Sequence, residues 1–460
     1  MSNNRLTPRP SEKAAPVFSG LPVFLTAALL CGLVLLSSAY GAQDLEAKKP
    51  NIILILTDDM GYGDIGVYGA RMIDTPHLDR MAKEGVRLTD FYASGNICTP
   101  SRAGLMTGRY AIRSGLAKNV IMPASTHGLP PEEITIAEML KGAGYDTLMI
   151  GKWHLGHQPE YWPTRHGFDA FFGVPYSNDM QPFALYEGED KIEEPVEQAT
   201  LTERYTARAV ETINAAGDRP FFIYLAHTFP HIPLYASEQF RGRSQASLYG
   251  DVVETLDWSL GEIIAALKER GVDRETLVIF TSDNGPWFEG ASGPLRARKG
   301  SSWEGGFRVP MIARWPGRLP KNRVIAEPAV NTDFAPTLAA LAGASLPADR
   351  PIDGKDIWPM LKDGAPTPHE DIFFFNNDQI VGVRRGKWKL VVQDYYRTFD
   401  VPLAQFQYPL LFDLERDPGE TYNLAPDHPD IVETLTARIA KAREDFGAPA
   451  PAPFSVEQEQ

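Results

Sequence analysis

The sequence predicts an α/β fold: a large, mostly parallel sheet sandwiched by helices, followed by a small C-terminal subdomain with an antiparallel sheet and a helix. Three observations support this prediction. Several short, nearly continuous apolar runs are typical of strands buried on both faces. Helical patterns lie between those runs, as expected for a parallel sheet with crossover helices. Near residue 369 the pattern changes to short strands separated by turns.

The N-terminus predicts an export signal over residues 1–41. Arg5, Arg9 and Lys13 precede an apolar run at residues 21–36, and small residues follow. This order is typical of a signal peptide. The run is shorter than the roughly 20 residues of a usual membrane-spanning helix, although an uncleaved anchor is the alternative. We therefore expect an exported protein, periplasmic or secreted, without stable membrane insertion after the signal is removed.

The composition indicates a globular protein that does not bind nucleic acid. Hydrophobic residues make up 43% of the chain and charged residues 23%, which is ordinary for a folded domain. The formal net charge is -14, whereas a general nucleic-acid-binding protein has a basic surface. An anionic substrate would need a locally positive pocket.

Polar residues follow four predicted strands at the points where the strands end. The strands are expected at residues 51–56, 147–150, 221–225 and 277–280, with helices at 134–142, 201–216 and 249–271. The polar residues that follow them are Asp58, Asp59, Lys152, His154, His231, Asp283 and Asn284. Because ligands bind beyond the carboxyl ends of parallel strands, four such strands predict one site.

The acidic members of this set predict a cation site. Asp58, Asp59, Asp283 and Asn284 offer only oxygen ligands, which favour calcium or magnesium. Three carboxylates at one edge would repel each other by about 4 kcal/mol per close pair, and a divalent cation would remove that repulsion. The alternative is that the first pair caps a helix and the second pair forms a turn.

Cys98 is the single cysteine outside the predicted signal, because Cys31 lies within it. It therefore has no partner for an internal disulfide after export. Pro100 suits the first turn of a helix that residues 101–110 could continue, which would place Cys98 near the positive helix end. Arg102, four residues on, would return to the same face. An inert buried cysteine is the alternative.

Residues 369–446 are predicted to form a C-terminal subdomain behind a catalytic domain at residues 50–368. Short strands are expected at residues 371–375, 379–383, 388–392 and 410–414, followed by a helix at 429–446. The tail at residues 447–460 is rich in Ala and Pro and is expected to be flexible.

Residues 98–102, Cys-Thr-Pro-Ser-Arg, and the Thr-Gly-Arg at residues 107–109 resemble the signature of the type I sulfatases. Further segments are similar to that family in the same order: residues 58–64, 151–156, 230–233, 299–306 and 417–424. The resemblance leans towards the arylsulfatase A and N-acetylgalactosamine-6-sulfatase branch. It implies an alkaline phosphatase-like fold and a sulfuric ester hydrolase that cleaves aryl or carbohydrate sulfate monoesters.

The resemblance also implies a role for each matched residue. A formylglycine-generating maturation enzyme would convert Cys98 to formylglycine, and Arg102 and His154 would assist the hydrated aldehyde. The calcium or magnesium ion would be held by position 98 and by Asp58, Asp59, Asp283 and Asn284. The small sulfated substrate would contact Lys152, Ser177, His231 and Lys299.

The implied reaction has two steps. One hydroxyl of the hydrate attacks sulfur, the cation and Asp283 favour its deprotonated form, and His231 protonates the leaving alcohol. The second hydroxyl, deprotonated with help from His154, then expels sulfate. A serine at position 98 would lack that second hydroxyl.

Three alternatives to this function are open at the level of sequence. One is a phosphonate monoester or phosphodiester hydrolase of the same superfamily. Another is a binding protein that has lost catalysis but keeps the pocket for a sulfated ligand, although every matched catalytic position is filled. The third is a hydrolase that uses the unmodified thiol of Cys98, which thiol alkylation would inhibit.

Overall fold

The computed structural model describes residues 49–394 and 408–450, and the chain from Lys49 onward forms one compact unit. The predicted signal peptide lies outside the described residues, as do residues 451–460 of the predicted tail.

The large sheet has 11 strands in the order β10-β2-β9-β8-β1-β7-β3-β4-β5-β6, with β11 paired to β2. The central strands β8, β1, β7, β3 and β4 run parallel to one another, whereas β9 runs antiparallel to both β2 and β8, and β5 runs antiparallel to β4. The strand bounds are β1 Asn51–Thr57, β2 Val86–Tyr92, β3 Asp146–Lys152, β4 Ala170–Val174, β5 Leu185–Glu187, β6 Asp190–Glu193, β7 Phe221–Ala226, β8 Thr276–Ser282, β9 Arg308–Arg314, β10 Arg323–Ile325 and β11 Ala329–Val330. The predicted mostly parallel sheet is confirmed.

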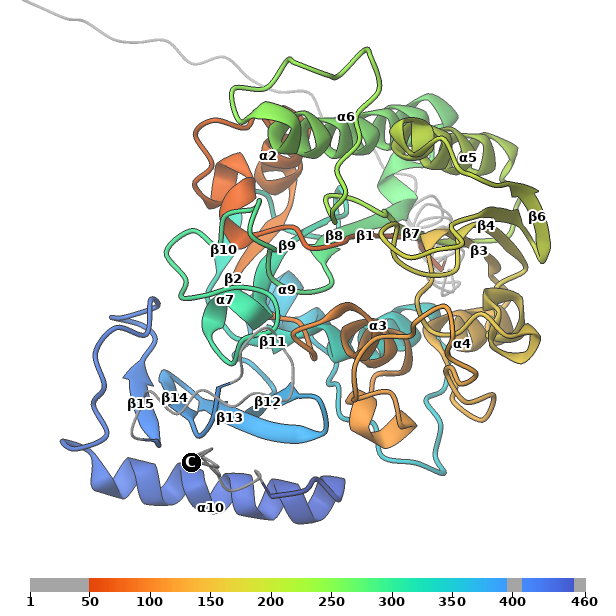
Figure 1. Cartoon of the computed structure of the whole chain (residues 1–460). Coiled ribbons are helices and arrows are strands. Elements are labelled where there is room, and N and C mark those ends of the chain that lie inside the picture. The colour runs from red at the N-terminus through yellow and green to blue at the C-terminus, as the bar shows by residue number, and fades with distance from the viewer. Residues whose placement is uncertain (1–48, 395–407, 451–460) are drawn as a thin grey trace, which may run out of the picture. The chain divides into compact units, whose positions relative to one another are not determined.

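Helices cover both faces of this sheet (Figure 1). Ile53 and Ile55 of β1 pack with residues of α2, α5 and α6, whereas Ile52, Leu54 and Leu56 pack with residues of α3, α4 and α8. Successive side chains of a strand point to opposite faces, so β1 needs apolar residues at every position. The helix bounds are α2 Pro76–Glu84, α3 Cys98–Thr107, α4 Ile136–Gly142, α5 Leu201–Ala215, α6 Ser247–Arg270, α7 Glu304–Phe307, α8 Phe334–Ala342, α9 Trp358–Asp363 and α10 Pro429–Phe446.

The C-terminal part contains the predicted antiparallel sheet and helix. Its order is β12-β13-β14-β15, and every pair is antiparallel. The strands are β12 Ile372–Asn376, β13 Gln379–Arg385, β14 Trp388–Val391 and β15 Leu410–Asp413. Leu435, Ile439 and Ala442 of α10 pack on this sheet, as the spacing of a helix face requires.

Two element ends differ from the sequence prediction. Helix α3 has Pro100 in its first turn, as predicted, but ends at Thr107, before the left-handed Gly108, rather than continuing to residue 110. Strand β3 continues to Lys152 rather than ending at residue 150. Cys98 and Lys152 therefore both lie on regular elements rather than on loops.

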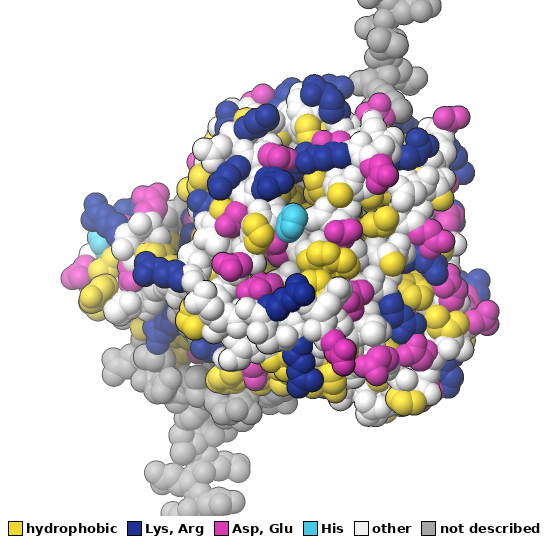
Figure 2. Space-filling view, turned by 90° about the horizontal axis from the view of Figure 1, so that it is seen from above, with side chains coloured by type: hydrophobic (Ala, Val, Ile, Leu, Met, Phe, Trp, Pro, Cys, Tyr) yellow, Lys and Arg dark blue, Asp and Glu magenta, His cyan; other side chains and the backbone are white. Residues whose placement is uncertain are grey.

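The face covered by α2, α5 and α6 carries acidic and basic side chains interspersed with scattered hydrophobic ones (Figure 2). Within residues 49–394 and 408–450, no helix combines the length and the apolar character needed to cross a membrane.

A buried carboxylate on this side of the sheet predicts a pH-dependent contribution to stability. Asp257 of α6 accepts hydrogen bonds from the backbone N–H groups of His77 and Leu78, at 3.1 and 2.7 Å, in the first turn of α2. Burial raises its pKa from 3.8 to about 7. The folded protein therefore binds a proton that the unfolded chain releases, and the stability this contributes is lost as pH rises from about 4 to about 7.

Asp257→Asn should remove this dependence, because an amide of the same size does not titrate. Urea unfolding at several pH values should show the wild type losing stability relative to the variant by up to about 1.4 kcal/mol per pH unit below pH 7. Glu269→Gln, an exposed change on the same helix, is the control and should follow the wild type. Parallel curves for Asp257→Asn and the wild type would contradict the assignment.

Candidate active site

The carboxyl ends of four neighbouring strands meet at one edge of the large sheet. Asp58 and Asp59 follow β1, Lys152 ends β3, His231 lies in the segment after β7, and Asp283 and Asn284 follow β8. In the sheet β1 lies between β7 and β8, and β3 is next to β7. The structure therefore brings together residues that are up to 226 positions apart in the chain.

Three buried carboxylates form the base of the site. Asp58, Asp59 and Asp283 are each at most 2% exposed. The backbone N–H of Asp59 donates to Asp283 Oδ1 at 3.2 Å, and Asn284 Nδ2 donates to Asp59 Oδ1 at 2.7 Å. Asp59 has φ of 66°, a left-handed conformation that is uncommon for residues other than glycine and is often found at functional sites.

These residues fit a hard divalent cation. Asn284 Oδ1 is buried, and no described residue donates a hydrogen bond to it, so it is an oxygen without a protein partner. Ligand atoms of Asp58, Cys98 and Asp283 all lie within 4.8 Å of one another, as do those of Asp59, Cys98 and His231. Burial and then the charge of Asp58 raise the pKa of Asp283 to about 7, which reflects the crowding of negative charge that a cation would relieve.

Arg102 links the helix to the carboxylates. Its Nε and Nη2 atoms each lie 2.9 Å from Asp283 Oδ2, and its Nη1 donates to the carbonyl of Lys152 at 2.7 Å. Its Nη2 also lies 3.6 Å from Asp58 Oδ1. The guanidinium is fully buried, and such a charge is stable only when paired in this way.

Two lysines from distant parts of the sequence contact carboxylates of this cluster. Lys152 Nζ lies 2.5 Å from Asp58 Oδ2, and Lys299 Nζ lies 2.7 Å from Asp59 Oδ1. Burial lowers the pKa of Lys299, but Asp59 and the other acidic groups outweigh it and raise the pKa above its usual range. Lys299 therefore stays positively charged and gives the site the locally positive character that an anion needs.

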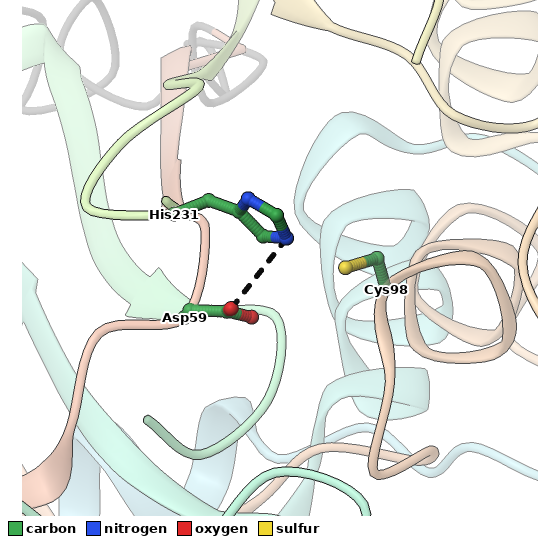
Figure 3. A group of neighbouring side chains, drawn as sticks. All are labelled: Asp59, Cys98 and His231. Atoms are coloured by element: carbon green, nitrogen blue, oxygen red, sulfur yellow. Dashed lines mark ion pairs between the residues drawn. The ribbon is translucent and has the colours of Figure 1, made fainter. Parts of the chain in front are cut away.

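Cys98 faces this cluster from the first turn of α3, opposite Asp59 and His231 (Figure 3). Its Sγ lies 3.4 Å from Asp58 Oδ1 and 3.5 Å from Lys299 Nζ, and the residue is 1% exposed. Burial and then Asp58 raise the pKa of the thiol. A protonated thiol is a weak nucleophile.

Two histidines occupy different environments beside the cluster. His231 Nε2 lies 3.7 Å from Asp59 Oδ2 (Figure 3). His154, with φ of 60°, donates from Nε2 to the carbonyl of Ile121 at 3.0 Å, and no described residue bonds its buried Nδ1. Burial and then Lys152 hold the pKa of His154 well below its usual range, so the ring is neutral and Nδ1 keeps a free lone pair.

Ser177 also belongs to the assembled group. It follows β4, is 1% exposed, and its Oγ accepts a hydrogen bond from Lys152 Nζ at 2.6 Å. The side chain of every residue predicted for the site therefore contacts the cluster, except that of His154, which bonds the backbone of Ile121 instead.

Asp64 is not among the residues predicted for the site, and it supports the site from the segment that follows β1. Its carboxylate accepts from the N–H of Gly61 at 2.7 Å and of Ala291 at 2.9 Å, and also from the hydroxyl of Tyr249. It thereby ties the segment after β1 to the segment that carries Lys299. Asp64 lies in the first of the segments that resemble the sulfatases, residues 58–64, and this position was the sequence signal that could have identified it.

Comparisons with known proteins cover nearly the whole described chain. The family described as Sulfatase matches residues 50–344, and the family described as N-sulphoglucosamine sulphohydrolase, C-terminal, matches residues 298–445. Arylsulfatase A of Homo sapiens is 38% identical, with 93% of this chain and 92% of that protein covered. N-acetylgalactosamine-6-sulfatase of Canis lupus familiaris is 37% identical, with 88% and 87% covered.

A solved structure gives the same result in three dimensions. The crystal structure of Ps i-CgsB in complex with k-i-k-neocarrahexaose has a TM-score of 0.78 and 30% sequence identity, and it covers 88% of this chain and 95% of that one. Fold and relatives agree on the class of protein, a sulfuric ester hydrolase. The chain belongs to the sulfatase family, and the resemblance of its motifs to the type I sulfatases is confirmed.

Proposed function

We propose that this sulfatase cleaves aryl or carbohydrate sulfate monoesters with a formylglycine derived from Cys98 and a calcium or magnesium ion. The position of Cys98 is the observation that carries the proposal. Its sulfur is buried at a helix N-terminus between Asp58 and Lys299, where an attacking oxygen would meet an anionic group held by cationic side chains. Asp58, Asp59, Asp283, Asn284 and position 98 would hold the ion.

The formylglycine and the divalent ion would supply chemistry that the unmodified side chains lack. The formylglycine hydrate offers two hydroxyls on one carbon, one to attack sulfur and one to release sulfate. The divalent ion would lower the pKa of the attacking hydroxyl and withdraw charge from the sulfate oxygens.

The cationic side chains bind and orient the sulfate group in this proposal. Lys152 contacts Asp58 and Lys299 contacts Asp59, so each already lies against a carboxylate of the cluster. Both would neutralise charge that develops on the sulfate oxygens. Arg102 holds Asp283 with two nitrogen atoms and would fix the side chain at position 98 against it. Lys152 would contact both Ser177 and the substrate.

Two proton transfers are assigned to the histidines. His231, which is 7% exposed, would donate a proton to the departing alcohol. His154 is fully buried, and the unbonded Nδ1 of its neutral ring would accept a proton from the hydrate in the second step.

The sulfated substrate would be a small aryl, sugar or glycolipid ester. The names of the relatives support this range, since they include an arylsulfatase and an N-acetylgalactosamine-6-sulfatase. The predicted signal pattern supports export to the periplasm or the medium. The motif around Cys98 supports a formylglycine-generating enzyme as the partner that matures the chain.

The mature protein should hydrolyse 4-nitrophenyl sulfate at least about 100-fold more efficiently, in kcat/KM, than bis(4-nitrophenyl) phosphate. A preference for the diester would favour the phosphodiester hydrolase, and no turnover of any sulfate ester would favour a binding protein. Mass spectrometry of the peptide containing position 98 should find the aldehyde. Activity should resist thiol alkylation but not a hydrazine, and an intact thiol in fully active protein would refute the proposed nucleophile.

A further inference from the structure

Lys299 lies in a long connection, residues 285–303, that contains no helix or strand. Its backbone N–H donates to the carbonyl of Pro286 at 3.0 Å, and that of Gly300 donates to the carbonyl of Asn96 at 3.0 Å. A side chain on such a segment keeps its place only if something outside the segment holds it. The neighbouring side chains from the C-terminal part of the molecule do so.

Asp394 holds the connection three and four residues beyond Lys299. It follows β14, is 3% exposed, and accepts one hydrogen bond on each carboxylate oxygen. The backbone N–H of Ser302 donates to Oδ1 at 2.9 Å, and Trp303 Nε1 donates to Oδ2 at 2.6 Å. An aspartate is the residue that satisfies two N–H donors in this arrangement, because an asparagine would present its own N–H₂ group to one of them.

Glu420 bonds the connection at Arg296 and also bonds the residue directly after the connection, Glu304. Its Oε2 accepts the backbone N–H of Glu304 at 2.6 Å, and its own carbonyl accepts from Arg296 Nη1 at 2.8 Å. Lys389 of β14 lies between the carboxylates of Glu304 and Glu420, at 2.9 and 2.8 Å, and all three are fully buried. The positions on both sides of Lys299 are therefore tied to the C-terminal part.

Aromatic packing adds to the hydrogen bonds that hold the connection. The guanidinium of Arg296 stacks on Trp303, with its Cζ 3.5 Å from the ring centroid. Trp303 also contacts Phe412 of β15 at 5.8 Å between ring centroids. In Figure 1 the sheet of β12 to β15 lies between α10 and the part of the molecule that contains α7. This packing joins the Lys299 connection to the small sheet, in addition to its bonds with the segment after β1.

We propose that Asp394 and Glu420 are positioning residues for Lys299, so that the C-terminal sheet helps to build the active site. The inference rests on the proposed role of Lys299 in contacting the sulfate group. Asp394→Asn removes one anchor without changing the size of the side chain. It should lower kcat/KM for 4-nitrophenyl sulfate by about tenfold, because a displacement near 1 Å of a group that contacts the reacting atoms has effects of this order or larger.

A double-mutant cycle with Lys299→Ala tests whether Asp394 acts through Lys299. In the Lys299→Ala background, Asp394→Asn should change kcat/KM by less than about twofold, since coupled residues are not additive. Inorganic sulfate should also inhibit Asp394→Asn more weakly than the wild type. Glu420→Gln and Trp303→Phe, the latter removing the indole donor, should behave in the same way. Conversion of Cys98 and the melting temperature are measured for every variant.

Asp413→Asn is the matched control, because Asp413 is a buried carboxylate of β15 that bonds Lys387 instead of the Lys299 connection. It should retain wild-type kcat/KM. Losses that multiply in the double variant, or unchanged activity in Asp394→Asn, would overturn the positioning role while leaving the role of Lys299 intact. Full turnover by Lys299→Ala would instead overturn the proposed role of Lys299, and the inference with it.

Discussion

Cys98→Ser should abolish multiple turnover of sulfate esters, with kcat at least about 1,000-fold below that of the wild type. The serine hydroxyl would occupy the position of the sulfur, beside Asp58 and Lys299, and could attack a bound sulfate group once. The resulting serine sulfate has no second hydroxyl on the same carbon to expel the sulfate. The covalent product should therefore accumulate.

Intact-protein mass spectrometry after incubation with substrate measures that accumulation directly. Cys98→Ser should gain the mass of one SO₃ group, and a burst of alcohol equal to the enzyme concentration should precede the halt. Cys98→Ala, which has no nucleophile, is the control and should show neither adduct nor burst. Sustained turnover by the serine variant would show that a single hydroxyl suffices and would contradict the two-hydroxyl mechanism.

Asp283→Asn should lower kcat/KM by at least about 100-fold and weaken cation binding. Asp283 contributes a negative oxygen beside Asp58 and Asp59, and it is also the main partner of Arg102. The amide keeps the volume but loses the charge. It would thus weaken the proposed cation site and leave the buried guanidinium with one fewer charged partner, which also lowers stability.

Removal of the ion should have the same effect on the wild type. After chelation, activity should fall, and titration with calcium and with magnesium should restore it to different extents and thereby identify the ion. Asp283→Asn should need a higher concentration of the same ion, whereas Asp413→Asn should match the wild type. Equal cation affinity in Asp283→Asn and the wild type, measured by calorimetry, would exclude Asp283 as a ligand.

The strands and the family could be predicted from the sequence because both leave local signals. A parallel strand such as β1 is buried on both faces, so its apolar run is continuous and the polar residues after it mark its end. The start of α3 has no capping side chain, because Ile97 precedes it, but Pro100 indicated that Cys98 lies at the N-terminal end of this helix. The predicted end was less accurate, because the helix stops at Thr107, before the left-handed Gly108, and not at residue 110.

The residues that hold the active site in place were harder to predict from the sequence. Asp394 lies in a segment without a motif, and nothing local indicates that its carboxylate bonds Trp303, 91 residues away. Glu420 belongs to a recognisable turn, but its bond to the N–H of Glu304 crosses 116 positions. Such contacts depend on how two sheets pack, and that packing is set by the whole chain.

By itself the sequence determined the fold class and the family, and it predicted a set of site residues, because strand periodicity and motif order are present along the chain. The tertiary structure alone decided how those residues meet. It placed Arg102 against Asp283, set Cys98 on the first turn of a helix, and joined the Lys299 connection to the C-terminal sheet. The distances between segments that are far apart in the chain depend on how the elements pack, and no local pattern of residues predicts them.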